Sequence, residues 1–414
     1  MNKSVKRLVL ILVAILISIL SFSLGRNSTF RKADISQTNE IETNESDRSD
    51  KTNDPRFKTV NQNIISLYNR INKDFLFDFD EEKAEEGIYK GILESLDDPY
   101  SVYYNEKEFK ELNEHTSGEF GGIGIQVSPA NGDLIEVISP IKDTPGEKAG
   151  IQSGDKILEI NGEAFFSKDL DKAVGVMRGE PGTTVNLKIK RGEGESSEII
   201  DLTIERAIIS VDSVFPKMLE NNIGYILLTG FQEHTGRDFI KAYEQLKNEG
   251  ATSIILDLRN NPGGLLESCM QIADYLMDKG TVINVRYKDG SSDTYETEDG
   301  SDKLPLVTLI NEGSASASEV LSGALQDHKR SEIVGKTSYG KGIIQNVYPI
   351  NMNGKAEGMK LTIAEFYTPN NNQIHGVGIK PDYEVEIPKD VKNIGVENLE
   401  NDTQLQKAIE LLNK

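Results

Sequence analysis

Three serines and one lysine in the stretch from residue 311 to residue 345 could together carry out nucleophilic catalysis. Ser314, Ser316 and Ser318 precede a predicted helix, and Lys341 follows between two glycines and ahead of two isoleucines. A serine at the start of a helix lies beside backbone N–H groups that the helix leaves unpaired, and such groups stabilise developing negative charge. A lysine can act as general base when burial lowers its pKa toward neutrality. The stretch therefore predicts a serine nucleophile with Lys341 as its base.

Each of these residues also has a purely structural interpretation. Serine is a favoured N-cap, so one of the three serines is expected to cap the helix. A lysine in a glycine turn is often a surface residue, although the apolar residues after Lys341 argue against that here. Gln345 follows on a predicted strand, where positions 341, 343 and 345 would share one face. Gln345 is thus placed to orient the lysine amine by a hydrogen bond.

A histidine-based triad fits the sequence less well. His328 is expected at the far end of the helix that follows the serines, and His234 and His375 lie in predicted loops without an evident carboxylate partner. No group of cysteines and histidines has metal-ligand spacing. The single cysteine, Cys269, cannot form an internal disulfide and is expected to be a small buried residue. We predict no metal site and no cofactor.

The overall charge argues against a nucleic-acid partner. The 414 residues include 46 basic and 67 acidic side chains, which gives a net charge of -21. A protein that binds nucleic acid would carry a basic stripe. The plainer role of an acidic surface is to keep the protein soluble. The length allows two or three domains.

Residues 1–25 predict a membrane anchor. Basic residues precede an apolar run, 8–24, that only serines interrupt. Such a run is near the lower limit of ~17–25 residues for a membrane-spanning helix, and its basic flank would remain in the cytoplasm. A cleaved signal peptide is the alternative, but no Ala-x-Ala site follows; a buried core helix is unexpected beside a basic cluster at the terminus. The predicted location is the cell membrane, single-pass, with the rest of the chain outside the cytoplasm, or secreted after signal cleavage.

A polar linker and a helical arm are expected next. Residues 26–56 have almost no apolar content and predict a disordered linker. Within 57–116, apolar residues recur every three or four positions in two segments, and the second segment stops before Pro99. Two amphipathic helices cannot form a core alone. We therefore interpret 57–116 as an arm for docking or dimerisation, and expect a homodimer.

Residues 117–206 predict a β-rich domain. A glycine-rich turn, Phe120-Gly-Gly-Ile-Gly-Ile125, enters a strand, and Gly154-Asp-Lys-Ile-Leu-Glu-Ile-Asn-Gly162 gives a turn, a strand and a second turn. This stretch resembles a PDZ domain, in which turn N–H groups hold a terminal carboxylate and a strand edge pairs with an extended peptide. An ordinary glycine hairpin is the alternative. The expected peptide-binding residues, whose side chains suggest apolar C-termini as ligands, are Gly122, Ile123, Gly124, Ile125, Val174 and Met177.

From residue 207 to 388 the pattern alternates strand and helix. Apolar strands are predicted at 223–228, 253–258 and 306–310, and the last two lead through glycine-rich or serine-rich turns into helices. This indicates a layered α/β sheet with functional loops at the strand ends. The tail, 389–414, contains a short amphipathic helix that is expected to pack with the N-terminal arm.

Three motifs together resemble those of the carboxy-terminal processing peptidases, also called tail-specific proteases. They are Asp257-Leu-Arg-Asn-Asn-Pro-Gly-Gly264, Gly313-Ser-Ala-Ser-Ala-Ser-Glu319 and Gly340-Lys-Gly342, and the similarity extends over about 57–388. The resemblance implies a crotonase-like α/β core with an inserted PDZ (β-barrel) domain. It also implies roles for six residues: Ser316 as nucleophile, Lys341 as base, Gln345 as the lysine-orienting residue, the N–H groups of Gly263 and Ala317 as oxyanion hole, and Arg178 in gating of the protease by the PDZ domain.

The sequence therefore favours an exported serine endopeptidase that binds apolar protein C-termini and cleaves near them. A non-catalytic PDZ adaptor at the membrane is the alternative from a different class, and the intact serine, lysine and glutamine set argues against it. A crotonase-type acyl-CoA enzyme would explain the glycine pairs. It would not explain the PDZ-like domain or Lys341.

Overall fold

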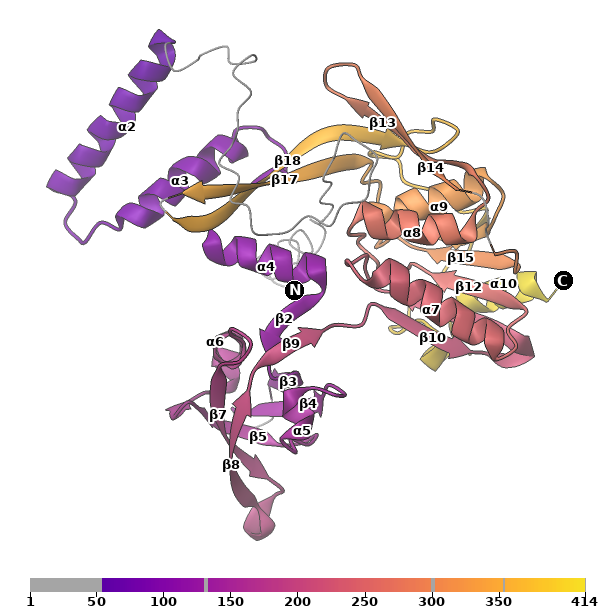
Figure 1. Cartoon of the computed structure of the whole chain (residues 1–414), viewed down its shortest axis with the longest axis horizontal. Helices are drawn as coiled ribbons and strands as arrows, with labels where there is room; N and C mark the ends of the chain where they lie inside the picture. The colour runs from indigo at the N-terminus through magenta and orange to yellow at the C-terminus, as the bar shows by residue number, and fades with distance from the viewer. Residues whose placement is uncertain (1–53, 130–132, 299–301, 353, 414) are drawn as a thin grey trace. The chain divides into compact units, whose positions relative to one another are not determined.

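The computed structural model describes residues 54–129, 133–298, 302–352 and 354–413. These residues form two compact units (Figure 1). The first, which we call the core unit, contains the described residues up to Leu112 together with Val214–Phe231 and the chain from Thr235 onward. The second, the inserted unit, contains Asn113–Ser213 and Gln232–His234. A β-rich unit thus interrupts an α/β unit, in agreement with the predicted fold class.

A six-stranded sheet forms the centre of the core unit. Its strand order is β10-β11-β12-β15-β16-β19, with parallel pairing throughout except for the antiparallel edge strand β10. Every residue of β12 and β15 is buried, as expected for parallel strands covered on both faces. The strands are β10 Val214–Met218, β11 Ile223–Leu228, β12 Ser253–Asp257, β15 Leu306–Ile310, β16 Glu332–Gly335 and β19 Tyr383–Glu384.

Helices cover both faces of this sheet. The helices are α7 Thr235–Asn248, α8 Leu266–Leu276, α9 Ala317–Asp327 and α10 Thr403–Leu412. Because side chains alternate along a strand, Ile226 packs with α7, α8 and α9, whereas Tyr225 packs with α10 on the opposite face. Figure 1 shows α7, α8 and α9 in one layer. The expectation that the tail helix packs with the N-terminal arm is wrong, because Leu405 and Ala408 of α10 are buried against the central sheet.

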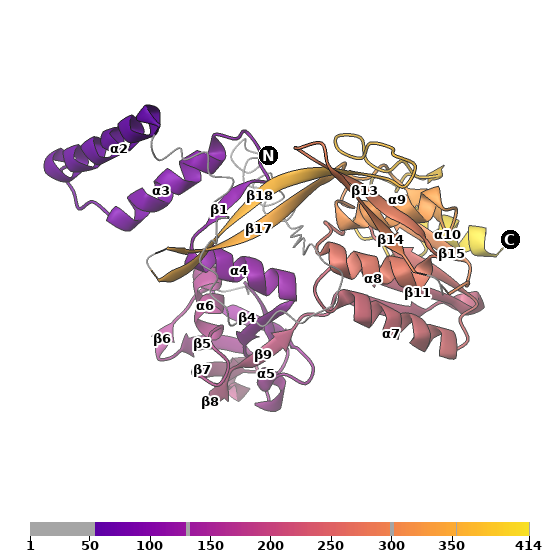
Figure 2. The ribbon, with the colours of Figure 1, turned by 45° about the horizontal axis from the view of Figure 1, so that its top comes forward.

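A second, antiparallel sheet of the core unit carries the chain that follows Lys341. Strands β17 and β18 form a long hairpin, and β18 also pairs with β1 and with β13, which pairs in turn with β14. Figure 2 shows this hairpin reaching toward β1 and α3. The strands are β1 Val102–Tyr104, β13 Gly280–Tyr287, β14 Ser292–Thr297, β17 Ile343–Met352 and β18 Lys355–Tyr367. The sequence predicted segments of β17 and β18 but not β1, β13 or β14.

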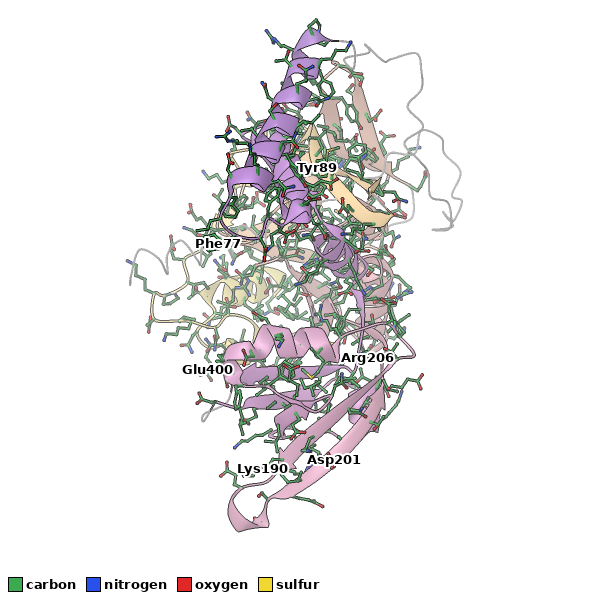
Figure 3. The ribbon with its side chains drawn as sticks, turned by 90° about the vertical axis from the view of Figure 1, so that its left-hand side faces the viewer. Phe77, Tyr89, Lys190, Asp201, Arg206 and Glu400 are labelled. Carbon is green, nitrogen blue, oxygen red and sulfur yellow. The ribbon has the colours of Figure 1, made fainter. Side chains whose placement is uncertain are left out.

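The N-terminal arm contains α2 Pro55–Asp74 and α3 Glu81–Glu94, and a third helix, α4 Glu106–Ser117, that the sequence reading missed. On α3, Tyr89 packs against Tyr103 of β1, with ring centroids 5.2 Å apart. By contrast, no residue of α2 is buried. Phe77, in the loop between α2 and α3, is 71% exposed (Figure 3). The arm therefore presents apolar side chains to solvent.

The predicted single-pass membrane location must be corrected. Within 54–129, 133–298, 302–352 and 354–413, no helix is both long and apolar enough to cross a bilayer. With 20 residues, α2 has the length, but its sequence, PRFKTVNQNIISLYNRINKD, is too polar and charged. The predicted anchor, 1–25, and the linker up to residue 53 lie outside the described residues.

The inserted unit is built on an antiparallel sheet of order β3-β4-β5-β7-β8, while β2 pairs with β9. Its core contains Ile135, Ile157 and Leu187. Arg206 (Figure 3) donates to the carbonyls of Val176, at 2.8 Å, and of Met177, at 3.1 Å, so it secures the end of α6. The elements are β2 Glu119–Gly122, β3 Ile125–Pro129, β4 Ile135–Pro140, α5 Pro145–Lys148, β5 Lys156–Ile160, β6 Glu163–Ala164, α6 Leu170–Met177, β7 Thr184–Arg191, β8 Glu198–Glu205 and β9 Ala207–Ser210.

Candidate active site

Ser316 occupies a strained backbone position at the start of α9. Its φ of 60° and ψ of -114° lie outside the regions that non-glycine residues favour, at a cost of about 1–3 kcal/mol. The residue is fully buried, and its Oγ has no hydrogen-bond partner among the described residues. A sharp strand-to-helix turn that holds a serine in such a conformation is typical of nucleophilic serines. The strain and the unpartnered hydroxyl set Ser316 apart from an ordinary helix cap.

The two neighbouring serines have structural partners. Ser314 Oγ donates to the carbonyl of Leu258 at 2.8 Å, and Ser318 Oγ donates to the carbonyl of Asn261 at 2.9 Å. Both bonds join the start of α9 to the loop after β12. The sequence alone left three serines in competition, and their contacts distinguish Ser316 from the other two.

Glu319 connects the backbone of Ser316 to that of Lys341. Its Oε2 accepts from the N–H groups of Ser316 and Lys341, both at 2.8 Å. Its Oε1 accepts from Gly340 N–H and Ser338 Oγ, both at 2.6 Å. Burial raises the pKa of Glu319, and these hydrogen bonds oppose that rise. Sequence reasoning missed this role, although the Ser-x-x-Glu spacing of a capping box, 316 to 319, was a signal for it.

Lys341 is fully buried. Burial lowers the pKa of its ammonium to about 8, against the opposing charges of Glu319 and Asp98. Its Nζ lies 4.8 Å from the ring centroid of Tyr100. A lysine in this environment has a substantial neutral fraction near pH 8, and the neutral amine is the form that can accept a proton.

Gln345 is also fully buried, but the route by which it was predicted needs revision. Strand β17 begins at Ile343, so Lys341 lies before the strand, and a register shift separates Ile344 from Gln345. Simple alternation along one strand therefore does not relate the two side chains. The amide Nε2 of Gln345 donates to Ile343 O over 3.4 Å, and Oε1 has no hydrogen-bond partner in the described part of the chain. A buried acceptor without a partner is suited to a donor such as a lysine amine.

The two expected oxyanion-hole residues lie against each other. A Cβ on Gly263 would come within 2.8 Å of Ser316 Cβ and 2.9 Å of Ala317 N, and the φ of Gly263 is +99°, so only glycine suits this position. Ala317 is the first residue of α9, where the helix leaves N–H groups unpaired. The N–H of Gly263, however, donates to Asn261 Oδ1 at 2.9 Å. One of the two expected donors is thus engaged by the protein itself.

A buried ion cluster holds the loop that carries Gly263. Arg259, which precedes this loop, bonds Asp257 at 2.6 Å and Asp402 at 2.8 Å, and all three side chains are almost completely buried. It also donates to Gln404 Oε1 at 3.0 Å. Asp402 and Gln404 belong to the start of α10, so the C-terminal helix helps to position the loop beside Ser316.

The histidines have other contacts. His328 Nε2 lies 2.7 Å from the carbonyl of Thr281. His234 belongs to the inserted unit, where its ring nitrogens face the carbonyls of Ser117 and Val211. The Nδ1 of His375 is buried without a hydrogen-bond partner among the residues described. Among the described residues, none of these contacts joins a histidine to Ser316.

The expected peptide-binding side chains gather in the hydrophobic core of the inserted unit. Ile123 and Met177 are buried, at 2% and 4% exposure, while Ile125 and Val174 are only partly buried. Gly124 adopts a φ of +72°, and its carbonyl accepts from Thr144 Oγ1 at 3.0 Å; the other predicted glycine, Gly122, ends β2. In this conformation Ile125 and Val174 retain exposed surface, and Ile123 and Met177 are core residues.

Arg178, the expected gating residue, makes its contacts within the inserted unit. Its guanidinium lies 4.3 Å from the ring centroid of Phe120 and bonds Glu114 at 3.2 Å. The side chain is 44% exposed, so this ion pair is worth at most about 1 kcal/mol.

Comparison with known proteins adds independent evidence. The sequence matches the Activating protease CtpB N-terminal domain over residues 22–108, a PDZ domain over 136–191 and Peptidase family S41 over 222–385. It is 37% identical over 344 residues to the carboxy-terminal processing protease CtpA of Bacillus subtilis (strain 168). This alignment covers 82% of this chain and 71% of that protein. The chain belongs to peptidase family S41. This S41 peptidase is a serine-type enzyme of the carboxy-terminal processing class.

Two further comparisons agree. The carboxy-terminal processing protease CtpB of Bacillus subtilis (strain 168) is 36% identical over 330 residues, covering 78% of this chain and 68% of that protein. A solved structure described as an S41 protease from Bacteroides fragilis NCTC 9343 covers 78% of this chain and 90% of its own, with a TM-score of 0.50 and 17% identity, which bears on the fold alone. The predicted fold class and the prediction of a serine peptidase are confirmed. These similarities count against the two alternatives, a non-catalytic PDZ adaptor and a crotonase-type acyl-CoA enzyme.

Proposed function

We propose that this S41 peptidase cleaves polypeptides through an acyl-enzyme on Ser316, with Lys341 as general base. The observation that carries the proposal is the Glu319 carboxylate, which binds the backbone N–H of both residues and so fixes their main chains to one group. The unpartnered Oγ of Ser316 and the lowered pKa of Lys341 supply the two chemical requirements, a free nucleophile and a neutral amine.

The reaction divides into acylation and deacylation of Ser316. The neutral Lys341 amine takes the Ser316 Oγ proton as Oγ attacks the scissile carbonyl, and the resulting ammonium then protonates the leaving amine. Water, deprotonated by the same amine, then attacks the acyl carbon, and the ammonium returns the proton to Ser316 Oγ as the acid product leaves. Gln345 Oε1 accepts from the lysine amine and keeps its lone pair directed at the serine. The N–H groups of Ala317 and Gly263 stabilise the oxyanion.

The described conformation is a closed form of this site. Ser316 and Lys341 have no exposed surface, and the N–H of Gly263 donates a hydrogen bond to Asn261 Oδ1. Substrate must therefore displace the covering groups and release that N–H from Asn261. This requirement accords with a gated enzyme.

The inserted unit is proposed to supply the substrate. Its glycine-rich turn, with Gly122 and Gly124, would hold the terminal carboxylate of a protein substrate, and Ile125 and Val174 would contact apolar side chains near that end. Arg178, at the end of α6, would transmit occupancy of the groove through its contacts with Glu114 and Phe120.

A homodimer through the N-terminal arm is part of the same proposal. Apolar side chains of α2 such as Ile65, Leu67 and Phe57 are 59%, 64% and 48% exposed. A helix that buries none of its own residues gains stability by packing against a partner, and the amphipathic pattern suits a second copy of the arm. Size-exclusion chromatography with light scattering tests this directly.

Cleavage of an unfolded casein by purified variants tests the catalytic proposal. Ser316→Ala and Lys341→Ala are each expected to lower kcat/KM by about 10⁴-fold or more, because members of a catalytic unit act together. Ser322→Ala is the matched control, since its hydroxyl bonds the carbonyl of Ser318 within α9 and should change activity only slightly. Wild-type cleavage by either catalytic variant would refute the assignment.

A further inference from the structure

The hydroxyl of Ser338 lies between the Glu319 carboxylate and the loop that follows β18. Ser338 is buried, with 6% exposure, and precedes Lys341 by three residues. Its Oγ donates to Glu319 Oε1 at 2.6 Å and accepts from the N–H of Ile379, also at 2.6 Å. The reaction described above assigns this hydroxyl no role.

The contact with Ile379 fixes the direction of the hydroxyl proton. A serine hydroxyl has one proton to donate and two lone pairs that accept. Because Ser338 Oγ accepts from the N–H of Ile379, its own proton is directed to Glu319 Oε1. The backbone supports this placement, since the N–H of Ser338 donates to Ile379 O at 3.1 Å. Ser338 is therefore a donor toward Glu319.

Within the described part of the chain, the groups hydrogen-bonded to the Glu319 side chain are all donors. Three of them are backbone N–H groups, and the fourth is the Ser338 hydroxyl. A backbone N–H cannot accept a proton, and the hydroxyl is directed as described. A protonated Glu319 would thus find no acceptor among its four neighbours. The arrangement suits an ionised carboxylate, although Glu319 has no exposed surface.

The Ser338 hydroxyl is the contact on which this charge depends most. Burial raises the pKa of Glu319, and among the hydrogen bonds that oppose the rise, the bond from Ser338 has the largest effect. Two other ionisable side chains face the carboxylate. They are Lys341, whose pKa burial lowers against the charge of Glu319, and Tyr100, whose pKa is raised chiefly by burial. Ser338 is also the only one of the four donors that a substitution can remove.

We propose that Ser338 is a positioning residue for the serine–lysine reaction, whose hydroxyl keeps Glu319 ionised near neutral pH and so keeps it bound to the backbones of the nucleophile and the base. The proposal rests on the proposed function of Ser316 and Lys341 and extends it. Protonation would turn an accepting oxygen of Glu319 into a donor and release the N–H groups that it holds. Ser338 thus acts through Glu319.

The pH profile of kcat/KM for unfolded casein, from about pH 5 to about pH 9, tests this role. Below the Lys341 pKa of about 8, the logarithm of wild-type kcat/KM should rise with a slope of about 1, because one proton must leave. In Ser338→Ala the ionised Glu319 loses a donor, so Glu319 takes up a proton at higher pH. The acid limb should then steepen to a slope of about 2, and the loss relative to the wild type should grow about tenfold with each further unit of pH.

Two single variants serve as controls. Ser338→Thr retains the hydroxyl and should keep the wild-type profile. Ser331→Ala is the matched control, since this buried serine contacts Thr308 Oγ1 at 2.9 Å and the carbonyl of Glu332. A slope of about 1 throughout in Ser338→Ala, whatever the height of its plateau, would show a merely structural role and overturn the proposal. An equal steepening in Ser331→Ala would overturn it as well.

The double variant Ser338→Ala/Glu319→Gln identifies the group that takes up the second proton. Glutamine has no carboxyl proton, so the slope should return to about 1 even though activity is low. A limb that remains steep would assign the second proton to another group and contradict the proposal. If thermal unfolding shows that Ser338→Ala does not fold, Ser338→Thr decides, because a wild-type profile agrees with the proposal and a steeper limb refutes it. An inactive wild type would count instead against the roles of Ser316 and Lys341.

Discussion

The loops around Ser316 differ in how they are built from the surface of the inserted unit around Ile125 and Val174. Around Ser316, polar groups are buried and held by short hydrogen bonds, as with Glu319. Around Ile125 and Val174, partly exposed aliphatic side chains lie on a hydrophobic core, and Arg178 makes a half-exposed ion pair. Chemistry requires fixed geometry, whereas recognition of varied chain ends requires adaptable contacts.

The difference also appears in what each region leaves unsatisfied. In the core unit, the buried Ser316 Oγ and Gln345 Oε1 have no hydrogen-bond partner among the described residues. Such buried groups cost free energy, and in a native protein they indicate a use. In the inserted unit, Arg206 donates to several carbonyls that surround it, at the end of α6 and the start of β7. Ser316 and Gln345 thus keep unpaired groups at the site of the proposed reaction, whereas the buried Arg206 supports the backbone of the inserted unit.

After the two catalytic variants, the largest expected effect comes from Glu319. Glu319→Ala should lower kcat for casein cleavage by about 10²–10³-fold, with little change in KM, because it releases the backbones of Ser316 and Lys341 without touching substrate. Glu319→Gln keeps the size of the side chain and should show an intermediate loss. Steady-state kinetics together with circular dichroism would check this. An Ala variant that folds and retains wild-type kcat would show that the carboxylate is dispensable for the fixed geometry.

The next effect concerns the ion cluster that holds the Gly263 loop. Asp402→Ala should destabilise the core unit by about 3–5 kcal/mol, because it leaves the buried Arg259 charge with fewer partners. Burial raises the pKa of Asp402, but the hydrogen bond and charge of Arg259 outweigh it and lower that pKa overall. The stabilisation is therefore present at neutral pH and is lost as the pH falls through the lowered pKa. Urea unfolding of the wild type and of Asp402→Ala, at neutral and at acidic pH, measures the loss of unfolding free energy and its dependence on pH. An equal loss at the two pH values would contradict this account.

The smallest effect should come from the recognition surface. Val174→Asp is expected to raise KM about tenfold for a substrate with an apolar C-terminus, while kcat at saturation changes little, since the partly buried position tolerates a small polar side chain and lies outside the catalytic unit. Leu202→Asp, at another partly buried position of the same core cluster but on β8 at the opposite edge of the sheet, is the control for damage to the core. A shared rise in KM for both variants would assign the effect to folding of the inserted unit.

Much of the fold could be predicted because its signals are local. The strands β11, β12 and β15 are continuous apolar runs, and α7, α8, α9 and α10 have helical periodicity, so neighbouring residues determine them. The strands β1 and β13 were missed because they pair with β18, which is distant in sequence. The strand β14, which was also missed, pairs with β13 in a hairpin attached to that sheet. The helix α4 was missed as well. Long-range pairing leaves little trace in a window of adjacent residues.

The candidate site divides in the same way. The sequence by itself determined which chemical groups are present: serines before a helix, a lysine between glycines, and a glycine loop after a buried strand. Tertiary structure decided which serine has no structural partner and that Glu319 joins Ser316 to Lys341. Tertiary structure also decided that the Gly263 N–H donates to Asn261 Oδ1. The physical reason is that residue type and local spacing set what a side chain can do, whereas burial, charge and hydrogen bonding depend on segments that only folding brings together.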